Sequence, residues 1–130
     1  MKSWITISTI VALCAISGCT TPTLSTQELG NTRDTSVGVV FVDSQGMTMY
    51  TYDEDESGKS NCTGMCAVFW PPVEAAKDAS PRDRFTLVDR GKGSKQWAYN
   101  GMPLYSYFLD DKPGDVSGDG ADGVWHVVHP

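Results

Sequence analysis

Residues 50–55 read Tyr-Thr-Tyr-Asp-Glu-Asp and residues 105–110 read Tyr-Ser-Tyr-Phe-Leu-Asp, so the pattern Y-x-Y-x-x-D occurs twice, 55 residues apart. When the chain is aligned with itself at this offset, seven residues within a gapless window of 28 are identical. A repeat of this period predicts two duplicated supersecondary units that share one core. The identical pairs are Gly46 and Gly101, Met47 and Met102, Tyr50 and Tyr105, Tyr52 and Tyr107, Asp55 and Asp110, Trp70 and Trp125, and Val73 and Val128.

Each unit is expected to contain a β-hairpin. Residues 37–42 are rich in β-branched side chains, and the turn signal Asp-Ser-Gln-Gly separates them from a second apolar run at 47–52. In the second unit, residues 96–99 lead through Asn-Gly into residues 102–107. Because both residues of an Asn-Gly pair tolerate positive φ, this dipeptide favours a type I′ hairpin turn.

Further strands are expected at residues 85–88 and 124–128, and one or two helical turns at 62–69, which end before Pro71. Helix signals are otherwise poor. The sequence therefore predicts an all-β fold, a small antiparallel domain of two pseudo-symmetric repeats that follows a signal peptide and a flexible tether.

The N-terminus predicts export and lipid attachment. Lys2 precedes an apolar run at residues 5–16, which is too short to span a membrane and has the length of a signal-peptide core. The following Ile-Ser-Gly-Cys, residues 16–19, resembles the lipobox of bacterial lipoproteins. That resemblance implies removal of residues 1–18, a diacylglycerol thioether on Cys19, and an acyl chain such as palmitate on its new amino group.

The mature chain is predicted to have two parts. Residues 19–36 are rich in Thr, Ser, Pro and Gly and are expected to form a flexible tether, and residues 37–130 to form the domain, with repeat one at about 37–73 and repeat two at about 92–128. Thr20, rather than Asp, follows the lipidated cysteine, which favours the outer membrane facing the periplasm in a Gram-negative cell. The net charge of −6 argues against nucleic acid as a partner.

The two motifs resemble those of the bacterial lipoprotein family called "secreted repeat of unknown function", which is described by a Y-x-[FWY]-x-x-D motif. Residues 62–72, Cys-Thr-Gly-Met-Cys-Ala-Val-Phe-Trp-Pro-Pro, are similar to that family's C-x-G-x-C-x-x-x-W-P-P element, and Gly123-Val124-Trp125 resembles the end of its second repeat. The resemblance implies an envelope location and a tandem repeat. It implies no activity.

The motif residues have a structural interpretation. Tyr50 and Tyr52 point to one face of a strand, as do Tyr105 and Tyr107, so their rings are expected in the core. The aspartate three residues later can accept hydrogen bonds from loop N–H groups or from a tyrosine hydroxyl. A ligand-binding role is the alternative. The motif residues are Tyr50, Tyr52, Asp55, Trp70, Tyr105, Tyr107, Asp110 and Trp125.

Cys62 and Cys66 are expected to form a structural disulfide, because the cell envelope is oxidising. Two alternatives remain open. The pair could be redox-active, or two thiolates together with Met65 and His126 or His129 could form a soft site for copper.

A calcium loop is a weaker hypothesis. Asp115, Ser117 and Asp119, followed by glycine, match the first half of an EF-hand-like loop. His126 occupies the position where such a loop has a bidentate glutamate, and a solvated connection is the alternative.

The expected function is non-catalytic binding or interaction in the cell envelope. The partners would be the membrane, through the lipid anchor, and an unknown envelope protein or small ligand, including a carbohydrate or peptide. A copper or redox accessory protein using the C-x₃-C pair is the alternative function. Asp55 and Asp110 could face each other like a glycosidase pair, but the short chain offers little room for a substrate cleft.

Overall fold

The structure is a computed structural model that describes residue 18 and residues 29–130. The predicted lipidation site Cys19, residues 1–17 of the predicted signal peptide and residues 20–28 of the predicted tether lie outside the described residues. Within the part that is described, no helix is long and apolar enough to cross a membrane.

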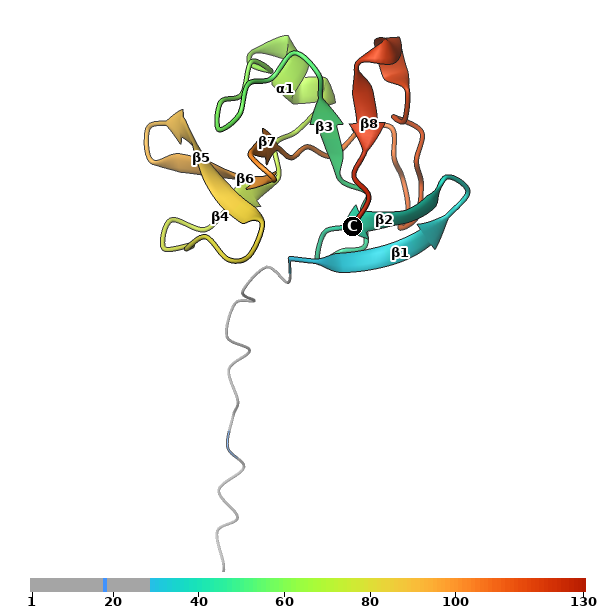
Figure 1. The fold of residues 1–130 in the computed structure, drawn as a ribbon, viewed down its shortest axis with the longest axis horizontal. Helices are drawn as coiled ribbons and strands as arrows, with labels where there is room; N and C mark the ends of the chain where they lie inside the picture. Colours follow the sequence, from blue (N-terminus) through green and yellow to red (C-terminus); the bar gives the residue numbers. More distant parts are fainter. Residues whose placement is uncertain (1–17, 19–28) are drawn as a thin grey trace, which may run out of the picture.

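The described chain consists almost entirely of short antiparallel strands (Figure 1). Strands β1 and β2 form one sheet, β3 and β8 a second, and β4, β6, β5 and β7 a third. This confirms the predicted all-β class. The elements are β1 (Asn31–Thr35), β2 (Gly38–Val42), β3 (Tyr50–Tyr52), α1 (Met65–Phe69), β4 (Glu74–Ala75), β5 (Phe85–Gly91), β6 (Ser94–Tyr99), β7 (Met102–Pro103), the 3₁₀ turn η1 (Ala121–Gly123) and β8 (Trp125–Val127).

Strand β1 corrects the predicted boundary of the tether. It lies inside the range 19–36, yet it pairs with β2 along its whole length, from Asn31 opposite Val42 to Thr35 opposite Gly38. All but the last of its five residues are exposed. The low apolar content of this segment therefore reflects a solvent-facing edge strand, which resembles a flexible linker in composition.

The predicted hairpin between residues 37–42 and 47–52 is only partly right. The predicted turn is present, and in it Gly46 donates its N–H to the Asp43 carbonyl at 2.9 Å. The return strand meets β2 only briefly, with Thr48 opposite Val42, and then leaves it to pair with β8. The second hairpin turn has the predicted geometry, since Asn100 and Gly101 both adopt positive φ, 51° and 85°.

The two repeats meet on a pseudo-twofold axis. Tyr50 donates its N–H to the Tyr105 carbonyl at 2.8 Å, and Tyr105 returns the bond at 2.9 Å. Equivalent residues can exchange hydrogen bonds in this way only where a twofold axis passes between them. On either side of the axis, the motif strand of one repeat pairs with the last strand of the other, Tyr50 with Val127 and Tyr105 with Pro72.

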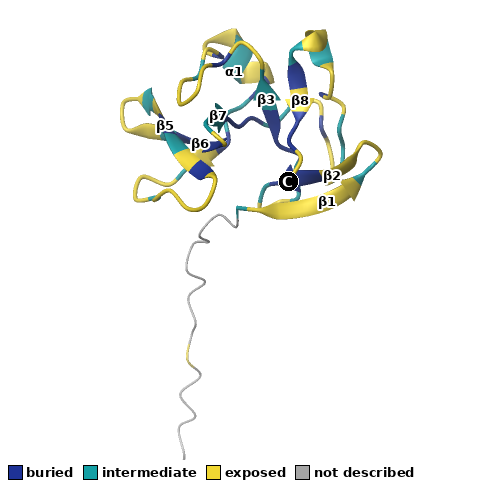
Figure 2. Cartoon of the chain, viewed as in Figure 1, coloured by how far each residue is buried: buried dark blue, intermediate teal, exposed yellow. Residues whose placement is uncertain are grey.

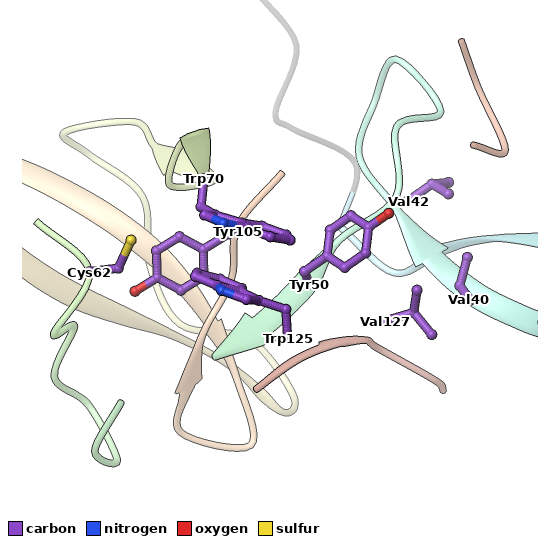
Figure 3. Packing of buried hydrophobic residues seen from close by; sticks show 8 residues of the cluster. All are labelled: Val40, Val42, Tyr50, Cys62, Trp70, Tyr105, Trp125 and Val127. Atoms are coloured by element: carbon purple, nitrogen blue, oxygen red, sulfur yellow. The ribbon is translucent and has the colours of Figure 1, made fainter. Parts of the chain in front are cut away.

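Four stacked aromatic rings form the centre of the core. The rings of Trp70 and Trp125 lie 3.8 Å apart and are parallel to within 2°. Tyr107 stacks on Trp70 at 4.2 Å, and Tyr52 stacks on Trp125 at 4.4 Å. Rings from the two repeats therefore alternate along the stack. Figure 3 shows the two indoles between Tyr50 and Tyr105, whose rings meet them edge-on.

A second cluster of buried side chains lies around the β4–β5–β6–β7 sheet and reaches across to β2 and the C-terminus. Figure 2 shows the buried segments of β2, β3, β6 and β8 facing the interior. The members of this cluster are Phe41, Met49, Val73, Phe85, Trp97, Tyr99, Leu104 and Val128.

We predict that Gly118→Ala destabilises the domain. A Cβ at this position would lie 2.7 Å from the Trp70 ring and 2.9 Å from the Tyr107 ring. Because both rings are fixed in the stack, the overpacking should reduce the free energy of unfolding by about 2 kcal/mol. Urea unfolding measures the change, and the neighbouring exposed substitution Ser117→Ala is the control, expected within about 0.5 kcal/mol of wild type. Equal stability of the two variants would contradict the prediction.

Candidate functional site

The tyrosines and aspartates of the two motifs form a crossed pair of hydrogen bonds, here called the crossed clamp. The Tyr50 hydroxyl donates to Asp110 Oδ2 and the Tyr105 hydroxyl donates to Asp55 Oδ2, each at 2.6 Å. Both tyrosines are fully buried, and both aspartates are 8% exposed. Each motif therefore supplies the donor of one bond and the acceptor of the other.

The second oxygen of each motif carboxylate holds the loop that follows its own strand. Asp55 Oδ1 accepts the N–H of Asn61 at 2.6 Å, and Asp110 Oδ1 accepts the N–H of Ser117 at 2.9 Å. Both oxygens of each aspartate are thus engaged in structural hydrogen bonds. This geometry matches a strand end with a loop clamp, the first of the two interpretations drawn from the sequence.

Burial shifts the pKa values of Asp55, Tyr50 and Tyr105. It raises the pKa of Asp55 above its ordinary value of 3.8, while the Tyr105 hydroxyl, the Asn61 N–H and the charge of Arg90 act in the opposite direction. Burial, followed by the hydrogen bond to an aspartate, also raises the pKa of Tyr50 and of Tyr105 well above the usual range. The two phenols therefore remain protonated donors at neutral pH.

Arg90 extends the network on the side of Tyr105. Its guanidinium donates to Ser60 Oγ at 2.7 Å, to Gln96 Oε1 at 2.8 Å and to the Cys62 carbonyl at 3.0 Å. Ser60 Oγ lies 2.6 Å from the Tyr105 hydroxyl. Every buried side-chain nitrogen and oxygen in the described residues has a hydrogen-bond partner. The sequence does not predict this network, because no motif includes residues so far apart in the chain.

The predicted disulfide between Cys62 and Cys66 is present, with a Cα–Cα distance of 5.2 Å. It ties the start of α1 to the preceding loop. Cys62 is fully buried beside Tyr105 (Figure 3), so that sulfur is shielded from an attacking thiol. This shielding favours a structural bond over the redox-active alternative.

The residues of the copper hypothesis are not arranged as a metal site. Both cysteine sulfurs are bonded to each other, and Met65 is 65% exposed. The imidazole of His126 lies 2.8 Å from Asp53 Oδ2, and His129 contacts the Val39 carbonyl. Within the described ranges, no group of three or more His, Cys, Asp and Glu side chains could hold a metal ion.

The residues proposed as calcium ligands form hydrogen bonds with the backbone and with Asp110 instead. Asp115 Oδ2 accepts the N–H groups of residues 111 and 112 at 3.0 and 3.1 Å. Asp119 Oδ1 accepts the N–H of Val127 at 3.0 Å, and Ser117 donates its own N–H to Asp110. The bond from Val127 to Asp119 joins the loop to β8, and the bonds to Asp115 restrain the loop itself. The aspartates therefore have a structural role in this glycine-rich loop.

Five large apolar side chains are exposed together and are here called the apolar patch. They come from α1 and from the variable positions of the second motif, and between 41% and 65% of each is exposed. The rings of Phe69 and Phe108 are 4.9 Å apart, and Phe108 donates its N–H to the Phe69 carbonyl at 3.0 Å, which joins the two segments. The members are Met65, Val68, Phe69, Phe108 and Leu109.

The fold does not require apolar side chains at residues 108 and 109. In the first motif, the positions of Phe108 and Leu109 are occupied by Asp53 and Glu54, which are exposed. The two segments make equivalent backbone hydrogen bonds. Asp53 donates its N–H to the Val124 carbonyl at 2.9 Å, and Phe108 donates its N–H to the carbonyl of Phe69, the last residue of α1. One backbone geometry thus carries charged side chains in one repeat and apolar side chains in the other.

The apolar patch is not among the sites that the sequence predicts. Of its members, only Met65 belongs to a predicted site, as a possible copper ligand. The self-alignment contains a signal for this surface, because it places Phe-Leu at residues 108–109 opposite Asp-Glu at residues 53–54. The self-alignment does not show the contact of Phe108 with Phe69, which places α1 beside the second motif.

A family model described as "secreted repeat of unknown function" matches the chain twice, at residues 31–74 and 86–129. The first match starts at β1 and the second one residue into β5, so each covers one complete structural repeat. No curated protein and no solved structure matches the chain.

We predict that Tyr50→Phe and Tyr105→Phe each lower the free energy of unfolding by about 2 kcal/mol, because each leaves the Oδ2 atom of a buried carboxylate without its donor. Tyr52→Phe is the control. It keeps the stacked ring, lies outside the crossed clamp and should stay within about 0.5 kcal/mol of wild type. Urea unfolding of the three variants measures the costs. The role of the crossed clamp is refuted if the first two variants are as stable as the third.

The pH dependence of stability tests the environment of Asp55. Since the pKa of Asp55 is raised in the folded state, its contribution is fully present below the unfolded-state pKa and is lost as the pH rises through the folded-state pKa. The stability of wild type relative to Asp55→Asn should therefore fall as the pH increases from about 3 to about 6. Urea unfolding across this range provides the data, with the exposed substitution Asp34→Asn as a control for loss of one charge. A difference that is constant or grows with pH would contradict the raised pKa.

Proposed function

This chain belongs to the family of secreted lipoprotein repeats of unknown function, and on that premise we propose that it is a lipid-anchored envelope protein that binds another envelope component through the apolar patch. The description of the family as secreted supports the envelope location. The Ile-Ser-Gly-Cys sequence at residues 16–19 supports acylation of Cys19, and Thr20 supports the outer membrane facing the periplasm.

The observation that carries the binding proposal is the exposure of five apolar side chains, two of which occupy positions where repeat one carries charged residues. Contiguous apolar surface on a small secreted domain commonly marks an interaction site. The equivalent surface of repeat one shows that the same backbone accepts Asp53 and Glu54. The apolar residues therefore need an explanation outside the fold, and partner binding supplies it.

The position of α1 supports a partner in the periplasm. Figure 1 shows α1 at the end of the domain opposite to the start of β1, where the chain enters the folded part. With Cys19 in the membrane, this arrangement would direct the apolar patch away from the lipid surface. A protein in the periplasmic space is then a better match than the anchoring bilayer.

Two contacts that hold α1 in place without a partner support a binding role for the apolar patch. The Cys62–Cys66 disulfide restrains α1 at its start, and the backbone bond from Phe108 to Phe69 restrains it at its end. A surface that is ordered in advance loses little conformational entropy on binding. Both oxygens of Asp55 and of Asp110 are engaged in hydrogen bonds, which favours binding over acid–base chemistry at the motif.

Site-specific photo-crosslinking in cells tests the proposal. A benzoyl-phenylalanine in place of Leu109 should give a discrete adduct on irradiation, and the same amino acid in place of Glu54, its pseudo-symmetric equivalent, should not. Adding Phe108→Asp to the Leu109 variant should abolish the adduct. No adduct from Leu109, or equal adducts from both positions, would refute the binding surface.

Membranes from the cells used for crosslinking also allow a test of the lipid anchor. Mass spectrometry should find the mature chain beginning at Cys19 with added diacylglyceryl and acyl mass, which Cys19→Ser removes. A mature chain without lipid mass would refute the anchor while leaving the crosslinking result to be judged on its own.

A further inference from the structure

Charge is distributed unevenly along the domain. Residues 43–73 contain five Asp and Glu against one Lys, and residues 101–130 contain the same numbers, whereas residues 74–100 contain four acidic and six basic residues. The two acidic segments are the ones that form the apolar patch. Among their acidic residues only Asp55 and Asp110 are buried, so the others contribute negative charge to the surface of the domain.

The chemistry at the patch itself is compatible with a cationic partner. Asp111 is exposed two residues after Leu109. Phe69 and Phe108 are 41% and 49% exposed, so their ring faces can attract a lysine or arginine by cation–π interaction. Apolar groups would take the centre of the contact and positive groups its edge.

The size of the patch favours a short partner segment over a second copy of the chain. A stable interface between two globular proteins uses about 20 to 30 residues on each side, and the patch has five. Two copies would also repel each other, since each carries a net charge of −6. The same negative charge opposes binding to anionic lipid.

We infer that the apolar patch formed by α1 and the second Y-x-Y-x-x-D motif binds a short amphipathic segment of an envelope protein, whose apolar side chains are flanked by lysine or arginine. The inference rests on the proposed function, because it names the chemistry of the partner at the same surface. Amphipathic helices bind apolar surfaces through a few apolar side chains at helical spacing, which suits a surface of five apolar residues.

The probe is a fluorescein-labelled peptide of about 14 residues built from Leu and Lys, with Leu at helical spacing. The lipidated chain in phosphatidylcholine nanodiscs is titrated into the peptide, and fluorescence anisotropy is measured against empty discs. Saturable binding above the level of empty discs is expected. A matched peptide with Glu in place of Lys should bind at least about tenfold more weakly, and raising the NaCl concentration should weaken binding of the Lys peptide.

The decisive variant is Phe108→Asp with Leu109→Glu, which gives the second motif the residues of the first. It adds negative charge and removes apolar surface, so binding driven by charge alone would become tighter. We expect binding to weaken by at least about tenfold. The matched control is Val37→Asp with Val39→Glu, which makes the same chemical change at two exposed residues of the β1–β2 hairpin and should leave binding intact. Unchanged thermal unfolding of both variants verifies that they fold.

Several results would overturn the inference. Equal binding of the Glu peptide, or no effect of the double substitution at residues 108 and 109, would remove the basis for a cationic amphipathic partner. A wild-type dimer that the double substitution dissociates would assign the patch to a second copy, and crosslinking from Leu109 to lipid would assign it to the membrane. If the Lys peptide fails to bind while the Leu109 protein adduct persists in cells, the partner chemistry is wrong and the proposed function stands.

Discussion

Two hydrogen bonds that cross between the repeats organise this domain. Tyr50 donates to Asp110 and Tyr105 donates to Asp55, and all four groups are buried. A single repeat would leave a phenol and a carboxylate without partners, and burying unpaired polar groups is costly. The stack of Trp and Tyr rings follows the same rule, because each ring lies against one from the other repeat. The two repeats therefore depend on each other for polar satisfaction as well as for packing.

This mutual dependence separates the positions that build the fold from those that are free to differ. The tyrosines and aspartates shared by both motifs make the crossed contacts, whereas the two positions before each aspartate face solvent. These positions hold Asp53 and Glu54 in one repeat and Phe108 and Leu109 in the other. Because the backbone is fixed by the crossed clamp, the surface chemistry can diverge without loss of the fold. The pseudo-symmetric core thus presents one acidic surface and one apolar surface.

Local signals in the sequence were accurate where the structure is determined by neighbouring residues. The Asn100-Gly101 turn, the strand that ends at Tyr99, the strand predicted at residues 37–42 and found at Gly38–Val42, and the disulfide all follow from residue type and short spacing. The prediction is wrong where a segment has a partner elsewhere in the chain. The polar residues of β1 indicate a tether, yet the strand pairs with β2. The residue types of the second loop leave both a solvated connection and a calcium loop open, and its aspartates accept hydrogen bonds from backbone N–H groups.

The residues alone predict two copies of one β unit, the positions of the hairpin turns and an N-terminal segment before them. Duplication is visible as a repeated residue pattern, and turn geometry depends on adjacent residues. The tertiary structure is needed to show that each tyrosine bonds to the aspartate of the other repeat, that β3 pairs with β8, and that Phe108 lies against α1. Those contacts join residues between 39 positions apart, for Phe69 and Phe108, and 77 positions apart, for Tyr50 and Val127. Which of these contacts form depends on the arrangement that buries the rings and gives every buried polar group a partner.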